Sequence, residues 1–160
     1  MANDFFHYTA PDPAPGPAAP VPAAPTGPAP IRLLADLGDE DWEKFIGYTA
    51  RRRYPAGAVV VARGALSPAL FFVASGQVQV QVPGAAATLR GEGEVVGLLS
   101  FLDAAPHAAE VLAATEVELL MLTPDGLSQL AAWQPRIAMA LMRDLGAHVA
   151  ARLRRLQPGD

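Results

Sequence analysis

Apolar and polar residues alternate strictly between residues 77 and 82, where Val78, Val80 and Val82 are separated by glutamines. A period of two is typical of a strand that has one face in the core and the other in water. Six further short segments resemble strands, and turns such as Ser75-Gly76 and Pro83-Gly84 separate them. Short strands at a spacing of roughly 8–12 residues indicate a β-sandwich or a jelly-roll barrel. The expected strands are residues 58–62, 70–74, 77–82, 87–90, 94–96, 109–113 and 116–122.

Helical patterns flank this predicted β region on both sides. Before it, Asp39 is the expected N-cap of a helix whose first turn is acidic and whose apolar residues are Trp42, Phe45 and Ile46. After it, Thr123 can cap a short helix over residues 125–132, and Pro124 suits the first helical position.

A longer helix is expected from Pro135 onward, because apolar residues recur there at steps of three and four. Such a stripe belongs to the core or to a dimer seam. His148 is expected on the surface of this helix or in that seam. The stripe contains Ala138, Leu141, Met142, Leu145, Val149, Leu153 and Leu156. Three arginines near its end, Arg152, Arg154 and Arg155, are expected to complement the helix dipole, with a partner-facing patch as the alternative.

The N-terminal part has a different composition. Residues 11–30 are rich in proline, alanine and glycine, which favours an extended spacer of about 60 Å at ~3.1 Å per residue. Residues 1–10 contain Phe5, Phe6 and Tyr8. These aromatics either belong to a disordered start or form a short peptide that docks on a protein partner. The expected division is therefore an aromatic peptide (1–10), a linker (11–30) and one folded domain (31–160).

Composition and charge narrow the classes of function. The 160-residue chain has a formal net charge of −4 and no cysteine, which argues against a general affinity for nucleic acid and against thiolate chemistry. Three adjacent arginines, residues 51–53, are expected to be solvated edge charges rather than an anion site. No signal peptide, metal motif or catalytic constellation is apparent, so we expect a non-enzymatic cytoplasmic protein without a bound metal.

The ordered turns and strands from Tyr54 to Val82, followed by Gly97 and Pro106, resemble a cyclic-nucleotide-binding domain of the catabolite activator protein/FNR superfamily. The resemblance covers roughly residues 33–156. It implies a mainly β fold, an eight-stranded jelly-roll β-barrel with an N-terminal helix and C-terminal helices. In that superfamily the long C-terminal helix pairs with its twin, which implies a possible homodimer. The last residues leave no room for a helix-turn-helix, so no direct DNA binding is expected.

Residues 90–111 resemble the phosphate-binding cassette of that family, but its polar ligands are replaced. Leu98 stands where the family has the glutamate that binds the ribose, and His107 stands where it has the arginine that binds the phosphate. Ala108 lacks the hydroxyl of the family's Ser or Thr. The residues of this degenerate cassette are Gly97, Leu98, Leu99, Ser100, His107 and Ala108. Backbone N–H groups at the start of its helix remain available to an anion.

Two lost charged contacts at ~1.5–3 kcal/mol each weaken binding roughly a hundredfold to ten-thousandfold. We therefore expect a regulatory or accessory subunit without a cofactor, tethered to a larger assembly by its N-terminal segment. Two alternatives stay open: a sensor that binds cyclic AMP, cyclic GMP or another small ligand weakly, and a detached sensor of a transcription regulator. His107 is either a loop residue without an assigned task or a pH-sensitive anion contact.

Overall fold

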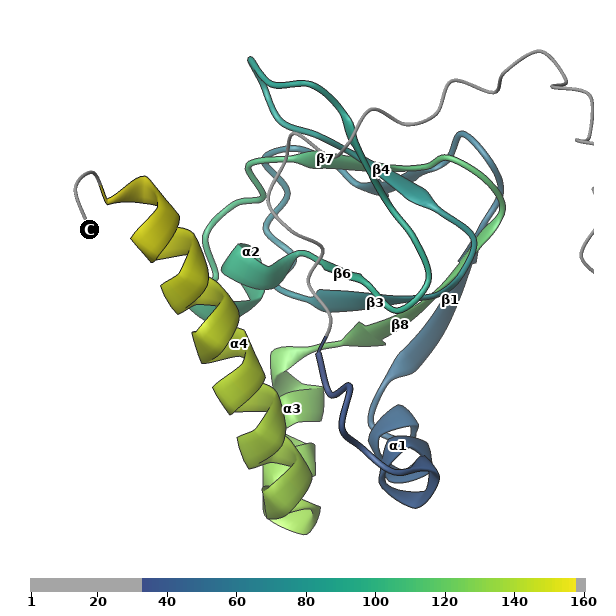
Figure 1. Ribbon diagram of the computed structural model, residues 1–160. Helices are drawn as coiled ribbons and strands as arrows, with labels where there is room; N and C mark the ends of the chain where they lie inside the picture. The colour runs from purple at the N-terminus through teal and green to yellow at the C-terminus, as the bar shows by residue number, and fades with distance from the viewer. Residues whose placement is uncertain (1–32, 158–160) are drawn as a thin grey trace, which may run out of the picture.

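The computed structural model describes residues 33–157, in which eight strands form two antiparallel four-stranded sheets that face each other (Figure 1). The first sheet has the order β1 (Ala50–Tyr54), β8 (Val117–Leu122), β3 (Leu70–Ser75) and β6 (Val95–Val96). The second has the order β2 (Val59–Val61), β7 (Glu110–Ala113), β4 (Val78–Gln81) and β5 (Thr88–Arg90). The predicted jelly-roll-type fold with eight strands is confirmed, although the two sheets are not joined into a closed barrel.

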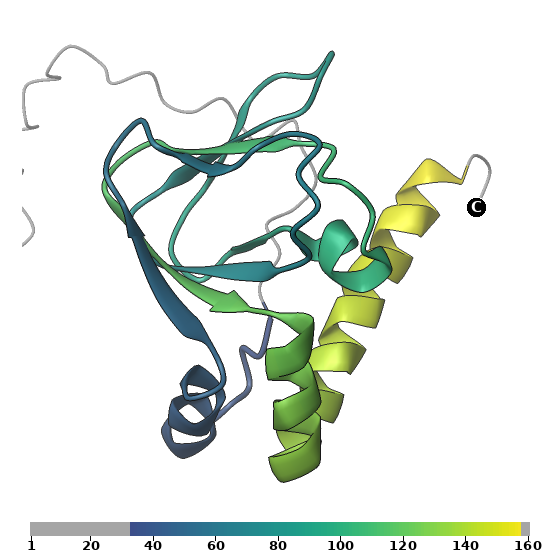
Figure 2. The ribbon, with the colours of Figure 1, turned by 180° about the vertical axis from the view of Figure 1, so that it is seen from behind.

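Four helices accompany the sheets: α1 (Asp39–Ile46), α2 (Leu98–Asp103), α3 (Pro124–Trp133) and α4 (Pro135–Leu156). Figure 2 shows α1, α3 and α4 beside the first sheet, and α2 between that sheet and α4. Among residues 33–157, no helix lies over the outer face of the second sheet (Figure 1).

The side chains of β3 alternate between two separate cores. Phe71 and Val73 point into the interior between the sheets, whereas Leu70 and Phe72 point to the helices. All four are at least 96% buried, because β3 is a central strand with a sheet on one side and helices on the other. The helix-side core also contains a stack of Trp42 on Phe45, with ring centroids 5.3 Å apart. A strand buried on both faces fixes the sheet between two hydrophobic layers.

The start of α1 differs from the prediction. The N-cap is Gly38, and no side chain caps the helix, so the assignment of Asp39 as N-cap is wrong. Asp39 instead opens an acidic first turn with Glu40 and Asp41, where carboxylates interact favourably with the helix dipole. Asp41 also accepts hydrogen bonds of 2.7 Å from Arg136 of α4, and this contact raises the pKa of Arg136.

The two C-terminal helices begin as predicted. Thr123 Oγ1 accepts a hydrogen bond from the N–H of Gly126 at 3.0 Å, and Pro124 occupies the first turn of α3. Pro135 begins α4, and Arg154 and Arg155 lie in its last turn. The described chain is tied to α4 at its start, because the N–H of Leu34 donates to Asp144 Oδ2 at 2.8 Å.

The predicted apolar stripe of α4 is divided between two faces. One face is buried against the helix-side core and contains Ile137, Ala138, Leu141 and Leu145. Other apolar residues are exposed: Met139 (63%), Met142 (41%), Leu153 (56%) and Leu156 (77%). Figures 1 and 2 show that the C-terminal part of α4 extends beyond the sheets. The helix therefore has more apolar surface than its own domain covers.

The arginine-rich segment 51–53 forms the edge strand β1. Its edge position agrees with the prediction, but two of the three charges are paired. Arg51 and Arg53 lie on one face of the strand and contact the same carboxylate, Glu118, at 2.6 and 3.3 Å. This pairing neutralises part of the positive edge and leaves no cluster of three free cations.

The predicted N-terminal peptide (1–10) and linker (11–30) lie outside the described residues. Between residues 33 and 157, each helix is too short or too polar to cross a lipid bilayer.

Candidate functional site

The predicted cassette begins at a turn that requires glycine. Gly97 follows β6 with φ of +85°, and a Cβ atom there would lie 2.5 Å from the carbonyl oxygen of Ala69. Both the left-handed conformation and the close approach exclude a side chain. This turn separates β6 from α2 and sets the direction of the short helix. The carbonyl of Gly97 accepts a hydrogen bond from the N–H of Phe101 at 3.1 Å.

The leucine at the predicted sugar-binding position points into the helix-side core. Leu98 is 4% exposed and belongs to the cluster that includes Phe45, Phe72 and Leu141. Its neighbour Leu99 is 48% exposed. The side chain of Leu98 therefore packs in the helix-side core and offers no polar atom to a ligand.

His107 has a definite structural task. It is 6% exposed, and its Nε2 lies 2.9 Å from the carbonyl oxygen of Ser67. A carbonyl oxygen only accepts, so Nε2 carries the proton and donates. The backbone of His107 makes two further bonds to the same β2–β3 connection, from its N–H to Ala65 at 3.0 Å and from Gly64 N–H to its carbonyl at 2.7 Å. His107 therefore fastens the end of the cassette to the connection between β2 and β3.

The remaining cassette residues divide between buried and exposed positions. Ser100 is 6% exposed, whereas Ala108 is exposed. The turn at Gly97, helix α2 and the segment at His107 follow one another directly in the chain. Position 98 has no carboxylate for a ribose, and position 107 has no guanidinium for a phosphate.

An ion pair inside the fold was not predicted from the sequence. Arg90 Nη1 and Glu94 Oε2 lie 3.7 Å apart, and their side chains are 11% and 14% exposed. Arg90 is paired with Val78 in the register of the second sheet, and the carbonyl of Glu94 accepts a hydrogen bond from the N–H of Val73 in the first sheet at 2.9 Å. Val78 and Val73 point into the interior between the sheets, and residues paired with them place their side chains on the same face. The ion pair of Arg90 and Glu94 therefore connects the two sheets in the interior. Glu94 Oε2 is buried and has no hydrogen-bond partner among the described residues.

The sequence contained one signal for this pair, the i,i+4 spacing of opposite charges. That spacing is common on solvated helices, and nothing in the sequence shows that a β corner turns both side chains inward. A buried carboxylate oxygen without a hydrogen bond is costly, and the ion pair with Arg90 offsets part of that cost.

These features fit the family comparison. The family model described as "Cyclic nucleotide-binding domain" matches residues 51–132, slightly more than half of the chain. The protein therefore belongs to the cyclic nucleotide-binding domain family, and its domain is of the catabolite activator protein/FNR type. Its fold, mainly β with flanking helices, is that of solved members.

Similarity to individual proteins supports the same assignment. The chain is 34% identical to the "Cyclic AMP receptor protein" of Thermus thermophilus over 127 residues, which cover 76% of this chain and 57% of that one. It is 34% identical to "Glutaminase 2" of Bradyrhizobium diazoefficiens over 122 residues, which cover 76% of this chain and only 19% of the relative. The chain thus spans less than two thirds of the length of these relatives.

Two solved structures show the same arrangement of elements. The catabolite activator protein of Thermus thermophilus has a TM-score of 0.65 at 32% identity, with 76% of this chain and 58% of that chain covered. The N-terminal domain of a transcriptional regulator from Streptomyces coelicolor has a TM-score of 0.64 at 29% identity, with 78% and 90% covered. The chain is therefore similar to the sensor part of regulatory proteins.

Proposed function

We propose that this protein is a non-enzymatic regulatory or interaction protein whose domain has lost the usual cyclic-nucleotide ligand and acts through its surface. The supporting observation is the position of His107. Its imidazole donates to the carbonyl of Ser67 inside the fold, so it is not free to contact a ligand phosphate. At the other end of the cassette, Leu98 is committed to the helix-side core.

The energetic consequence is a large loss of affinity. An imidazole cannot form the two parallel charge-assisted bonds that a guanidinium gives to a phosphate. A leucine gives nothing to a ribose hydroxyl. At ~1.5–3 kcal/mol for each lost contact, the affinity for a cyclic mononucleotide falls by roughly two to four orders of magnitude.

Isothermal titration calorimetry on the full chain tests this loss. With cyclic AMP, cyclic GMP and cyclic dinucleotides, we expect dissociation constants weaker than about 1 µM. Linear AMP serves as the matched control, because it has the same base and sugar but no cyclic phosphate. Saturable binding of one cyclic nucleotide below about 1 µM, without binding of linear AMP, contradicts the proposal.

A small-ligand sensor is the second candidate, and one observation favours it. The interior pair of Arg90 and Glu94 contains an unsatisfied carboxylate oxygen, to which the N–H or O–H group of a ligand could donate. In the same titrations, a cyclic nucleotide that binds to the wild-type chain and not to Glu94→Gln would favour this function over the first.

The role of an accessory subunit depends on the N-terminal segment. We propose that Phe5, Phe6 and Tyr8 anchor the chain to a protein partner through the proline-rich linker, because aromatic side chains dominate binding hot spots. The variant Phe5→Ala/Phe6→Ala/Tyr8→Ala is expected to fold as the wild type and to lose the partner on purification from native cells. The matched control is Asn3→Ala/Thr9→Ala, which keeps the aromatics. Retention of the same partner by the aromatic variant contradicts the tether.

We also propose that α4 pairs with α4 of a second copy. Apolar or small residues recur along the exposed part of the helix at alternating steps of three and four, the period of a coiled-coil seam. A helix that extends beyond its own domain needs such a partner, because isolated helices are marginal in water. The seam, which we call the α4 seam, consists of Met139, Met142, Gly146, Val149, Leu153 and Leu156.

A further inference from the structure

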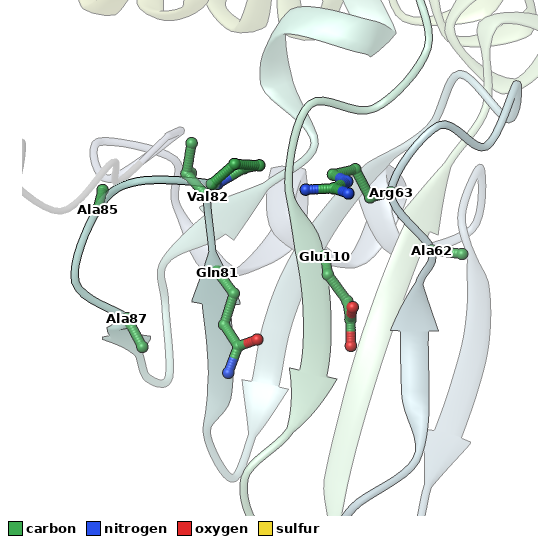
Figure 3. A pocket seen from close by; sticks show the side chains of 8 residues that line it. Ala62, Arg63, Gln81, Val82, Ala85, Ala87 and Glu110 are labelled. Atoms are coloured by element: carbon green, nitrogen blue, oxygen red, sulfur yellow. The ribbon is translucent and has the colours of Figure 1, made fainter.

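A hollow of about 650 Å³ lies on the outer face of the second sheet (Figure 3). Gln81 of β4 and Glu110 of β7 are register partners, and their neighbours Val80 and Val111 pack with the interior core. Gln81 and Glu110 therefore point outward, because successive residues of a strand alternate between its faces. The remaining residues that line the hollow are mainly small or apolar: Ala62, Val82, Pro83, Ala85 and Ala87.

Two opposite charges line this hollow without pairing. Within residues 33–157, neither Arg63 nor Glu110 has a described ion pair or side-chain hydrogen bond. Figure 3 shows the Arg63 guanidinium extending toward Val82, while the Glu110 carboxylate and the Gln81 amide extend side by side in another direction. The lining of the hollow thus contains both a cation and a carboxylate.

A row of outward-facing side chains, three of them apolar, crosses the same outer face of the second sheet. Val59 is the register partner of Leu112, and Leu112 and Leu89 are both partners of Gln79. Val59 is 53% exposed and Leu89 is 49% exposed. No described helix covers this face (Figure 1). The hollow and the row together form a surface that we call the outer-sheet groove.

We propose that the outer-sheet groove is the docking site of the chain's own N-terminal segment, residues 4–8 (DFFHY). The segment carries three aromatics for the apolar lining, and Asp4 matches Arg63. His7 matches Glu110. An amphipathic peptide with one acid before its aromatics complements a groove with one unpaired cation at its rim.

The length of the intervening chain permits this contact in one molecule. Twenty-four residues separate Tyr8 from Leu33, and they reach roughly 75 Å at ~3.1 Å per residue. A folded domain of 125 residues has a radius of gyration of only about 14 Å. The segment can therefore reach the groove from Leu34, which is held at α4.

When the aromatic segment is docked on its own domain, it is unavailable to a partner, and when it is released, it is available. A tethered peptide has an effective concentration on the order of mM at its own domain. An external partner has to displace it, so the groove regulates access to Phe5, Phe6 and Tyr8. The docking requires neither an external partner nor the loss of the nucleotide ligand. It can therefore fail while the proposed loss of the ligand and the proposed partner tether both stand.

Paramagnetic NMR on the full chain tests the proposal. The sequence has no cysteine, so Ala2→Cys accepts a single nitroxide label next to the segment. We expect selective broadening of the amides of Arg63, Gln81, Ala85 and Leu89, with Ala147 of α4 and Lys44 of α1 unaffected. Broadening has to be independent of protein concentration. Uniform broadening, broadening centred on α4, or broadening that disappears on dilution overturns the proposal.

Charge exchange distinguishes the proposed contact of Asp4 with Arg63 from nonspecific association of the aromatic segment. Asp4→Arg and Arg63→Asp are each expected to reduce the docked fraction about twofold to fivefold, and the double exchange is expected to restore it. Phe5→Ala/Phe6→Ala is expected to abolish selective broadening, whereas Asn3→Ala leaves it unchanged. Equal broadening in the wild type and Asp4→Arg, or no restoration in the double variant, contradicts the pairing of these two residues.

Discussion

The substitution Leu98→Glu is expected to destabilise the protein by about 3–5 kcal/mol and to create no tight site for a cyclic nucleotide. Although it restores the family's residue type, the leucine here is 4% exposed and contacts the helix-side core. Removing its methyl groups and burying a carboxyl are both unfavourable. Because proteins of this size are stable by only about 5–15 kcal/mol, the loss is a large fraction of the total.

This penalty should depend on pH in a defined direction. Burial raises the pKa of an introduced carboxyl above its ordinary value of about 4.3. Between the unfolded and folded pKa values only the native state binds the proton, so the free energy of unfolding falls as pH rises through that interval. The deficit relative to wild type is therefore largest at neutral pH and smaller at low pH.

Urea unfolding measures both effects, with Trp42 as a reporter because it stacks on Phe45 in the same core. Leu98→Met is the matched control, since it conserves volume and should cost less than about 1.5 kcal/mol. A Leu98→Glu/His107→Arg variant tests restoration of the full cassette. If that variant is as stable as the wild type and binds cyclic AMP below about 1 µM, the proposed loss of function through core packing is wrong.

Introducing charges into the α4 seam is expected to convert a dimer into a monomer. Met142→Glu/Leu153→Glu places two carboxylates from each helix opposite two from its twin, and like charges in a coiled-coil seam are strongly unfavourable. Met142 and Leu153 are 41% and 56% exposed in the single chain, so the substitutions leave its own core intact. Light scattering on a sizing column should give twice the chain mass for the wild type and once for the variant.

The matched control for the seam is Ala147→Glu/Ala151→Glu, on the same helix but outside the three-and-four pattern. It should remain a dimer. A wild-type chain that is monomeric at tens of µM, or a control that dissociates as readily as the seam variant, contradicts pairing through α4. Circular dichroism confirms that both variants keep the fold.

The position of most elements could be read from the sequence because local rules control them. The valine and glutamine alternation located β4, and the Thr123-Pro124 start located α3. The acidic run at α1 was also recognised, but its cap was placed one residue late. Gly38 adopts the extended cap conformation and Asp39 already lies in the helix, a difference that composition cannot resolve.

The roles of the site residues were harder to predict, because they depend on direction rather than on position. His107 was identified as the residue in place of an arginine, but only the fold shows its ring bonded to Ser67, forty residues earlier. Arg90 and Glu94 were not predicted at all. Their contact exists because a corner between β5 and β6 turns both side chains inward.

The sequence by itself indicated the family and most of the strands and helices, because these follow from residue types and the order of short-range motifs. It also places a leucine at position 98 and a histidine at position 107. The tertiary structure decided which face each residue occupies. It assigned Leu98 to the core, divided the apolar positions of α4 between the core and the exposed surface, and placed Arg63 and Glu110 at one hollow. These outcomes depend on strand register and helix packing, which join residues far apart in the chain and have no local pattern.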